Sequence, residues 1–589
     1  MRQYKSPFWK AFNSRTELEK YGVDGLLLFA LQLRFSIEDI DLVAAASLTE
    51  GRDDKKADLV YIDSETGYAI IAQTYMAVKV TGKTGELKKE APSNKASDLN
   101  TAISWLLARP IGEVPENMRP HAEELRQVLS DHKIRSIQLW YVHNLPESTN
   151  VKQELRTVEQ TTRSHLLANF ENCEDVEIQG IELGISTLEG LYQSISTPIL
   201  VAEEFMIPIP GGFEIKEANW RAYATSVQAS WLYAQFRKHG TDLLSANVRE
   251  YLGSRNVDRN INNAMKQTAN DDPEHFWVFN NGITVLVHSF EEKTMKSGMF
   301  LKFTGISVVN GAQTVGAIGS LDSPPNDKAM VQVRFITCDS TDTVYDIVRY
   351  NNSQNKIAAP DFRSTDIVQR RLTKEFATIP RINYVARRGG REDIIKRQPD
   401  TLPSVTAGQS LAAFHGDPGI AYHEKTHMWE DDHLYSKYFG LQTTAKHILF
   451  TYSLLKSVEN KKLSLINRSK TADILEVEKA QLDFFRKRGS TFLMSSAVAR
   501  CLEIILNKPI PNYFNLVFKS NLSPDIAITQ WSSIIEAASG FTAPLAEGLA
   551  DGFRTRGKVE GAIKIFQSLL VSTRETNKEI YLRFAEQVN

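Results

Sequence analysis

Two Asn-Gly pairs, Asn281-Gly282 and Asn310-Gly311, constrain the fold of this chain more than any other feature. Each lies beside an apolar run rich in β-branched residues, within residues 274–316. An Asn-Gly pair beside such a run marks a turn that requires a positive φ. Small polar residues follow both turns: Thr284, Gln313 and Thr314. We therefore predict two strand ends whose amide, hydroxyl and backbone N–H groups grip a polar ligand; the alternative is two ordinary strand turns.

The length and charge of the chain limit the classes of protein to which it can belong. At 589 residues it is too long for one hydrophobic core, so we expect two to four domains. Its 42% hydrophobic and 24% charged residues are typical of a folded soluble protein. The 69 basic and 71 acidic residues nearly cancel. Any binding of nucleic acid must therefore use a local basic patch.

Cysteine usage and hydropathy indicate the compartment. The three cysteines, Cys173, Cys338 and Cys501, are far apart in the sequence and form no metal-spaced pair. This argues for a reducing compartment and against a zinc ribbon. The sequence shows neither a signal peptide nor an apolar run long enough to span a bilayer. We therefore predict a cytoplasmic protein that does not enter a membrane.

Strands and helices alternate in the first 200 residues. β-Branched and aromatic runs flanked by turn formers predict strands at 57–62, 68–80, 134–142 and 176–183. Helical periodicity predicts helices near 25–35, 96–107, 120–132 and 151–170. Such alternation builds an α/β layer.

The first two of these strands carry the layout of a metal-dependent nuclease. Asp58 opens the first strand and Gln73 lies in the second, with Glu50 upstream. Nuclease chemistry needs hard oxygen ligands for Mg²⁺ and a lysine that activates the attacking water. Tyr75 stands where that lysine belongs, although strand alternation places Lys79 on the same face. In one interpretation Asp58 binds Mg²⁺ and catalyses cleavage together with Gln73, Lys79 and Glu50. In the other, the site is a degenerate remnant of a nuclease.

Four segments of the central region carry a family resemblance. In chain order they read NVREYLG, FWVFNNGIT, VVNGAQT and NNSQNKIAAPDFRSTDIVQRRL. Together, over roughly 242–397, they resemble the AIPR (abortive infection phage resistance) family, and the nuclease-like segment resembles what often precedes that core. The resemblance implies bacterial antiphage defence. Family members with Gln-x-Lys in the N-terminal part look like restriction-type nucleases, and this chain departs from them at the lysine.

A looser similarity connects the second Asn-Gly turn to DGQHR and ParB-like proteins, in which a related turn and a later Asn/Gln segment surround a nucleotide. Asn310 stands where those proteins have Asp, and Gln313-Thr314 stand near their Gln-His-Arg. The similarity implies one polar pocket in which Arg249 clamps a phosphate and amides read a base or sugar. The pocket residues would be Arg249, Asn281, Asn310, Gln313, Asn352 and Gln354. The alternative is that these amides only cross-link strand ends.

A basic cluster follows this region. Arg387, Arg388 and Arg391 surround Gly389-Gly390, with Arg381, Lys396 and Arg397 close by. Such a cluster on a glycine loop suits contact with a phosphate backbone. A solvated surface loop is the other interpretation.

The periodicity elsewhere predicts a helix near 219–236, a strand at 330–337 and a mainly helical region beyond 441. One motif there suggests metal chemistry. His423, Glu424 and His427 have the spacing that zinc proteases use on a helix, and His433 follows. The alternative is that these histidines are structural or incidental.

These observations predict a multidomain α/β (α+β) protein. We expect a restriction-endonuclease-like domain at 1–200, a mixed α/β AIPR core at 201–400 and a mainly α-helical domain at 401–589. The predicted function is bacterial antiphage defence through nucleic acid, either as a Mg²⁺-dependent nuclease or as a non-cleaving sensor that binds a nucleotide or nucleic acid. The expected partners are DNA or RNA, and a second copy or a partner protein at the helical domain.

Overall fold

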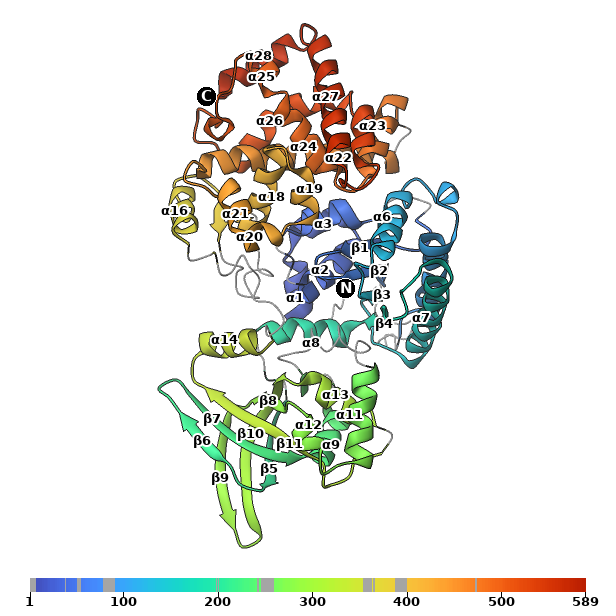
Figure 1. Cartoon of the computed structure of the whole chain (residues 1–589), viewed down its shortest axis with the longest axis vertical. Helices are drawn as coiled ribbons and strands as arrows, with labels where there is room; N and C mark the ends of the chain where they lie inside the picture. Colours follow the sequence, from blue (N-terminus) through green and yellow to red (C-terminus); the bar gives the residue numbers. More distant parts are fainter. Residues whose placement is uncertain are drawn as a thin grey trace.

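The computed structural model describes residues 7–35, 37, 39–49, 54–77, 90–196, 199, 201–240, 243–244, 259–321, 323–352, 363, 366–386, 400–471 and 474–589. It shows a multidomain protein of mixed helices and strands, as predicted. Three parts follow one another along the longest axis (Figure 1). The N-terminal α/β layer lies between the C-terminal helical part and the central sheet, which is therefore at one end of the molecule.

The N-terminal layer is built on a four-stranded sheet with the order β1-β2-β3-β4. β1 (Leu59–Asp63) is antiparallel to β2 (Tyr68–Tyr75), whereas β3 (Ser136–His143) and β4 (Glu177–Leu183) continue parallel to β2. Parallel neighbours require long crossover connections, and helices provide them here. All eight residues of β3 are buried, since helices cover both faces. The predicted alternation of strands and helices is thus confirmed.

The helical and 3₁₀ or π segments of this layer are α1 (Pro7–Asn13), η1 (Thr16–Tyr21), α2 (Asp24–Phe35), α3 (Ile40–Ser47), α4 (Ser93–Ser97), α5 (Leu99–Ile103), η2 (Ser104–Ala108), η3 (Ile111–Glu113), α6 (Arg119–Ser130), α7 (Thr149–Asn169) and α8 (Ile185–Ser196). The strand predicted at 68–80 is shorter than expected, and β2 ends at Tyr75. The Asn144 side chain bonds both backbone groups of Ala77, at 2.7 Å to its N–H and 3.0 Å to its carbonyl oxygen. A side chain thus replaces the sheet ladder there.

The central sheet has the strand order β5-β10-β8-β11-β7-β6, and β9 pairs with β10. Its strands are β5 (Val201–Ile209), β6 (Phe213–Lys216), β7 (Trp220–Gln228), β8 (Ile283–Leu286), β9 (Ser289–Met295), β10 (Gly298–Asn310) and β11 (Met330–Cys338). Its helices are α9 (Ala229–His239), α11 (Arg259–Asp271), α12 (Phe276–Phe279), α13 (Ala312–Gly319) and α14 (Thr341–Asn352). One sheet face packs against α9, α11 and α13, whereas the opposite face packs against α14 around Ile336 and Val348.

Two predictions for this region are wrong. Residues 220–228, expected to be helical, form β7, because they alternate in burial and pair with all nine residues of β11. This pairing is remote in sequence and overrides the local helical pattern. Phe276–Phe279 was expected to be strand but forms the helical turn α12, and β8 begins only after the first Asn-Gly pair.

The C-terminal part is helical, as predicted, around the 27-residue helix α22 (Ala445–Thr471). Its core includes Trp531, whose ring lies 4.8 Å from Phe450 and 4.5 Å from Phe584. This core also takes in residues from Leu372 onward. The other elements are α16 (Ile367–Phe376), β12 (Asn383–Val385), β13 (Thr401–Pro403), α18 (Ser404–Phe414), α19 (Pro418–His423), α20 (His427–Glu430), α21 (Asp432–Tyr438), α23 (Glu476–Arg486), α24 (Ser490–Arg500), α25 (Leu502–Leu506), η6 (Tyr513–Asn515), α26 (Pro524–Ser539), η7 (Ala543–Leu549), α27 (Arg556–Ser572) and α28 (Lys578–Gln587).

Charged contacts join the N-terminal layer to the helical part. Lys456 Nζ on α22 lies 2.9 Å from Asp39 Oδ2 and 2.8 Å from Glu459 Oε2, and all three side chains are buried. Lys425 Nζ lies 3.0 Å from Asp63 Oδ2 in the β1–β2 turn. Such buried charges require their partners, so these contacts fix how the two parts pack. Within the described ranges, no helix is long and apolar enough to cross a membrane.

Candidate functional site on the central sheet

The two Asn-Gly pairs come together at one edge of the central sheet. Asn310, the last residue of β10, pairs with Thr284 on β8. Both glycines have the predicted positive φ, 73° at Gly282 and 88° at Gly311. A Cβ at Gly311 would lie 2.6 Å from Ile283 Cγ2 and 2.8 Å from the Gly282 carbonyl oxygen. Only glycine therefore allows the two turns to touch.

The Asn280 side chain connects the two turns. Its Oδ1 accepts a hydrogen bond from the Gly282 N–H at 2.8 Å, and its Nδ2 donates to Thr314 Oγ1 at 3.1 Å. Thr314 lies in the first turn of α13, which begins directly after Gly311. The first N–H groups of a helix have no partner within the helix, and its dipole favours a negative charge there.

An arginine lies on the sheet face that α14 partly covers. Arg334 on β11 pairs in register with Thr284 on β8, and its Nη2 donates to Thr284 Oγ1 at 2.8 Å. The same nitrogen lies 3.3 Å from Asn351 Oδ1 in the last turn of α14. In the part of the chain that the structure describes, no carboxylate pairs with this guanidinium. Arg334 is thus positioned by two neutral groups, and its exposed positive charge is not balanced by any carboxylate of the described residues.

Exposed apolar residues, two of them aromatic, adjoin this face. Trp277, Val278 and Phe279 on α12 are 45%, 62% and 69% exposed. Trp277 Nε1 donates to Ser226 Oγ at 2.8 Å, which places the indole over β7. Ser226 pairs with Gln332, two residues from Arg334 on the same face of β11. The indole therefore sits about 7 Å along the strand direction from the register position of Arg334.

The structure brings three of the predicted binding residues, Asn281, Asn310 and Gln313, to this one edge. Asn352 is the last residue of α14, beside Asn351. Arg249, Gln354, Arg387, Arg388 and Arg391 lie outside the described residues. Sequence reasoning missed Asn280, Arg334, Asn351 and Trp277. Arg334 had a signal, since VQVRFIT places Gln332 and Arg334 on the face opposite to Val331, Val333 and Phe335.

Residues 244–535 match the family model described as AIPR protein. The chain belongs to the AIPR family. Membership indicates a role in abortive-infection defence against phage. No curated protein and no solved structure matches the chain. The family match covers the sheet edge at which the two Asn-Gly pairs meet, hereafter the twin Asn-Gly edge. It continues into α26, well beyond residues 242–397 of the sequence resemblance. The N-terminal layer lies outside the match.

In this AIPR protein, the structure also brings the predicted nuclease residues Asp58 and Gln73 together. Asp58 Oδ2 accepts from the Thr74 N–H at 2.6 Å and from Gln73 Nε2 at 3.3 Å. Burial raises the pKa of Asp58 to about 6, although the Thr74 N–H opposes the shift. Mg²⁺ takes several oxygen ligands, and among the described residues no group of three His, Cys, Asp or Glu side chains could hold a metal. Glu50 and Lys79, the other two predicted catalytic residues, lie outside the described residues, so the Mg²⁺ site stays a prediction.

The raised pKa of Asp58 makes stability depend on pH. The fold favours the protonated carboxyl, so its contribution to stability is present at pH 4 and is lost as the pH rises through about 6. An Asp58→Asn variant should be more stable than the unaltered protein at pH 8, by about 1–3 kcal/mol, and no more stable at pH 4. Urea unfolding at both pH values measures this difference.

Repeating the pH 8 measurement with millimolar Mg²⁺ tests the metal-site interpretation. We expect Mg²⁺ to leave both proteins unchanged. Stabilisation by Mg²⁺ that disappears in Asp58→Asn would instead identify Asp58 as a metal ligand.

The zinc-protease motif of the AIPR protein is not on one helix. His423 ends α19 and His427 begins α20, and Glu424 caps the first of these short helices. His423 Nε2 lies 2.7 Å from the Gly552 carbonyl oxygen and so serves a structural contact. The two histidines therefore do not share the single helical face that the zinc-protease interpretation requires, since the chain leaves the helical conformation between them. His433 lies on a third helix, α21.

Proposed function

We propose that this protein acts in antiphage defence by binding nucleic acid on the face of its central sheet that carries Arg334 and that α14 partly covers. The main support is the position of Arg334, which hydrogen bonds to Thr284 and Asn351 hold beside the two Asn-Gly turns. A guanidinium held in place without a carboxylate suits a phosphate group, which it can bind through two parallel hydrogen bonds. The N-terminus of α13 adds a second region of positive potential at the adjoining edge.

The neighbouring aromatic side chains support a single strand rather than a duplex. Bases of a single strand are free to stack on exposed rings, and each stacked base contributes about 1–3 kcal/mol. Trp277 is held by Ser226 on the same sheet face as Arg334, so one strand could place a phosphate on the arginine and a base on the indole. The overall charge of −2 agrees with a local contact of this kind.

Replacing Arg334 by glutamine tests this proposal. We expect the variant to bind labelled single-stranded DNA and RNA 12-mers about tenfold more weakly, because it loses a charge-assisted hydrogen bond. The slope of log affinity against log salt should fall by about one, since one phosphate contact is lost. Fluorescence anisotropy over a series of salt concentrations measures both quantities.

Arg221 on β7 provides the matched control. Its Nε already pairs with Glu214 Oε1 at 2.7 Å, so Arg221→Gln should leave oligonucleotide affinity unchanged. A Trp277→Ala variant should weaken binding of oligonucleotides but not alter the salt slope. Equal affinity in the unaltered protein and Arg334→Gln would contradict the proposal.

Magnesium-dependent cleavage is the second candidate function, and it rests on the contact between Asp58 and Gln73 across the paired strands. Among the described residues, the proposed metal site contains one carboxylate, Asp58, which already accepts two hydrogen bonds. We therefore favour binding of nucleic acid without cleavage. Incubation of plasmid DNA and of RNA with the purified protein and Mg²⁺ separates the two. Cleavage that Asp58→Asn abolishes and Arg334→Gln retains would favour the nuclease.

A further inference from the structure

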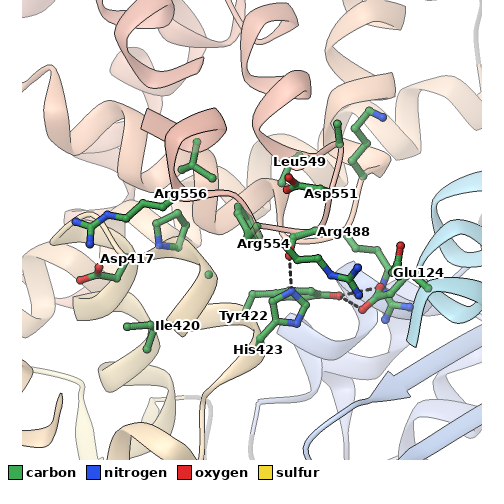
Figure 2. Close-up of a pocket in the computed structure, with 18 of the residues that line it drawn as sticks. Glu124, Asp417, Ile420, Tyr422, His423, Arg488, Leu549, Asp551, Arg554 and Arg556 are labelled. Carbon is green, nitrogen blue, oxygen red and sulfur yellow. Dashed lines mark hydrogen bonds and ion pairs between the residues drawn. The ribbon is translucent and has the colours of Figure 1, made fainter. Parts of the chain in front are cut away.

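A cavity of about 1140 Å³ lies between the N-terminal layer and the helical part, far along the chain from the twin Asn-Gly edge. Its walls come from α6 on one side and from α19, the end of α24, α27 and the turn between η7 and α27 on the other (Figure 2). This volume slightly exceeds the range of about 300–1,000 Å³ that is typical of small-molecule pockets. Boundaries between domains are also common places for such pockets.

Charges at the back of the cavity neutralise one another. Arg488 forms an ion pair with Glu124 of α6, and Tyr422 Oη donates to the same carboxylate at 2.7 and 2.9 Å. Figure 2 shows Arg488 and Tyr422 both pointing at Glu124 across the boundary between the two parts. Arg554 pairs with Asp131 across the same boundary. These contacts hold the parts together and leave no charge for a ligand.

Other cations of the cavity remain unbalanced. Within the described ranges, no carboxylate pairs with Lys487, Arg500 or Lys564. The acidic lining residues Asp417, Asp551 and Glu560 already have basic partners, whereas Glu123 and Glu424 have none among the described residues. Arg126 and Lys133 add two further cations, so the unpaired groups of the lining carry net positive charge. The cavity therefore favours an anion.

Arg500 at the end of α24 and Lys564 on α27 are two of these cations, and their helices pack against each other. Gln567, one turn after Lys564 on α27, donates through Nε2 to the Arg500 carbonyl oxygen at 3.3 Å, so the two helices meet there. A Cβ at Gly416, where φ is 95°, would come within 3.1 Å of Arg500 Nη2. Glycine thus leaves room for the guanidinium, which can bind a phosphate through two hydrogen bonds.

An aromatic residue of the lining has an unfavourable backbone conformation. Phe553 has a φ of 68°, which is rare for a bulky residue. A Cβ at Gly489 would lie 2.3 Å from Phe553 Cε2, so the ring fills the space that this glycine leaves. The ring also lies edge-on to Tyr422 and His423. Such strain persists where packing fixes it and is concentrated at ligand-binding sites.

We propose that this cavity binds a phosphorylated small molecule of nucleotide size. Its phosphates lie at Arg500 and Lys564, and its organic part lies toward Phe553. Since α6 forms one wall and the helical part forms the others, the bound molecule bridges the two parts and tightens their contact. This site differs from the sheet face in location and in the form of ligand it takes.

Thermal unfolding of the full chain with millimolar ATP, pyrophosphate or adenosine tests the proposal. ATP and pyrophosphate should raise the Tm, and adenosine alone should not, because the phosphates bind the cations. Arg500→Gln should weaken the ATP affinity about tenfold or more, measured by calorimetric titration. Lys564→Gln provides a second variant, and the Tm without ligand verifies that both variants fold.

Two control variants separate the sites. Arg583 lies on the surface of α28 and pairs with Glu579, so Arg583→Gln should keep the full shift in Tm. Arg334→Gln should also keep it, because the sheet face is elsewhere. A shift lost in Arg334→Gln and kept in Arg500→Gln would overturn the cavity proposal and support the sheet site. No shift with ATP or pyrophosphate in the unaltered protein would also overturn it.

Discussion

Replacing Lys456 by methionine is expected to destabilise the protein by about 3–5 kcal/mol, because it leaves buried carboxylates without their cation. Lys456 lies between Asp39 of the N-terminal layer and Glu459 of its own helix, at 2.9 and 2.8 Å. Burial already raises the pKa of Glu459 to about 7 with Lys456 present. Denaturant unfolding of the two proteins at the same pH measures the loss.

The loss should also depend on pH. Without Lys456 the pKa of Glu459 rises further, so protonation at pH 5 relieves the buried charge and the loss of stability is larger at pH 8. Lys461, five residues along α22, is the matched control, since its partner Glu536 is exposed. Lys461→Met should cost about 1 kcal/mol or less. Equal costs for the two variants would contradict the assignment of Lys456 as a buried link between the parts.

Replacing Gly311 by alanine should cost about 2–5 kcal/mol and greatly weaken oligonucleotide binding. The left-handed backbone conformation costs a residue with a Cβ about 1–2 kcal/mol, and overpacking adds about 1–3 kcal/mol. The new methyl group would meet Ile283 and the Gly282 carbonyl oxygen, at 2.6 and 2.8 Å. The two Asn-Gly turns would then have to separate. Urea unfolding and fluorescence anisotropy measure the two effects.

Gly240 is the matched control for this variant. Its φ of 55° is also positive, but a Cβ there meets no atom of the described residues within 4 Å. Gly240→Ala should therefore cost only the conformational term and should leave oligonucleotide binding unchanged. If both glycine variants kept full binding, the contact between the turns would have no part in recognition.

Elements with strong local signals could be predicted from the sequence. The β1–β2 turn, the parallel strands, the hairpin before β10 and the C-terminal helices have clear patterns of turn formers or apolar periodicity. The wrong assignments, at 220–228 and 276–279, concern segments whose state depends on remote partners. β7 is a strand because β11 pairs with it across a hundred residues of sequence. The zinc-like motif is likewise split between α19 and α20, and its His423 contacts Gly552, 129 residues away in the sequence.

The sequence by itself determined that both Asn-Gly pairs need a positive φ, since only glycine adopts that conformation without cost. It also determined the family, through four ordered motifs that the family model matches. Only the tertiary structure decided that the two turns touch and that Arg334 and Trp277 lie on one face of the central sheet. It alone also created the cavity between the N-terminal layer and the helical part. These features depend on strand register and on contacts between distant segments, which no local spacing encodes.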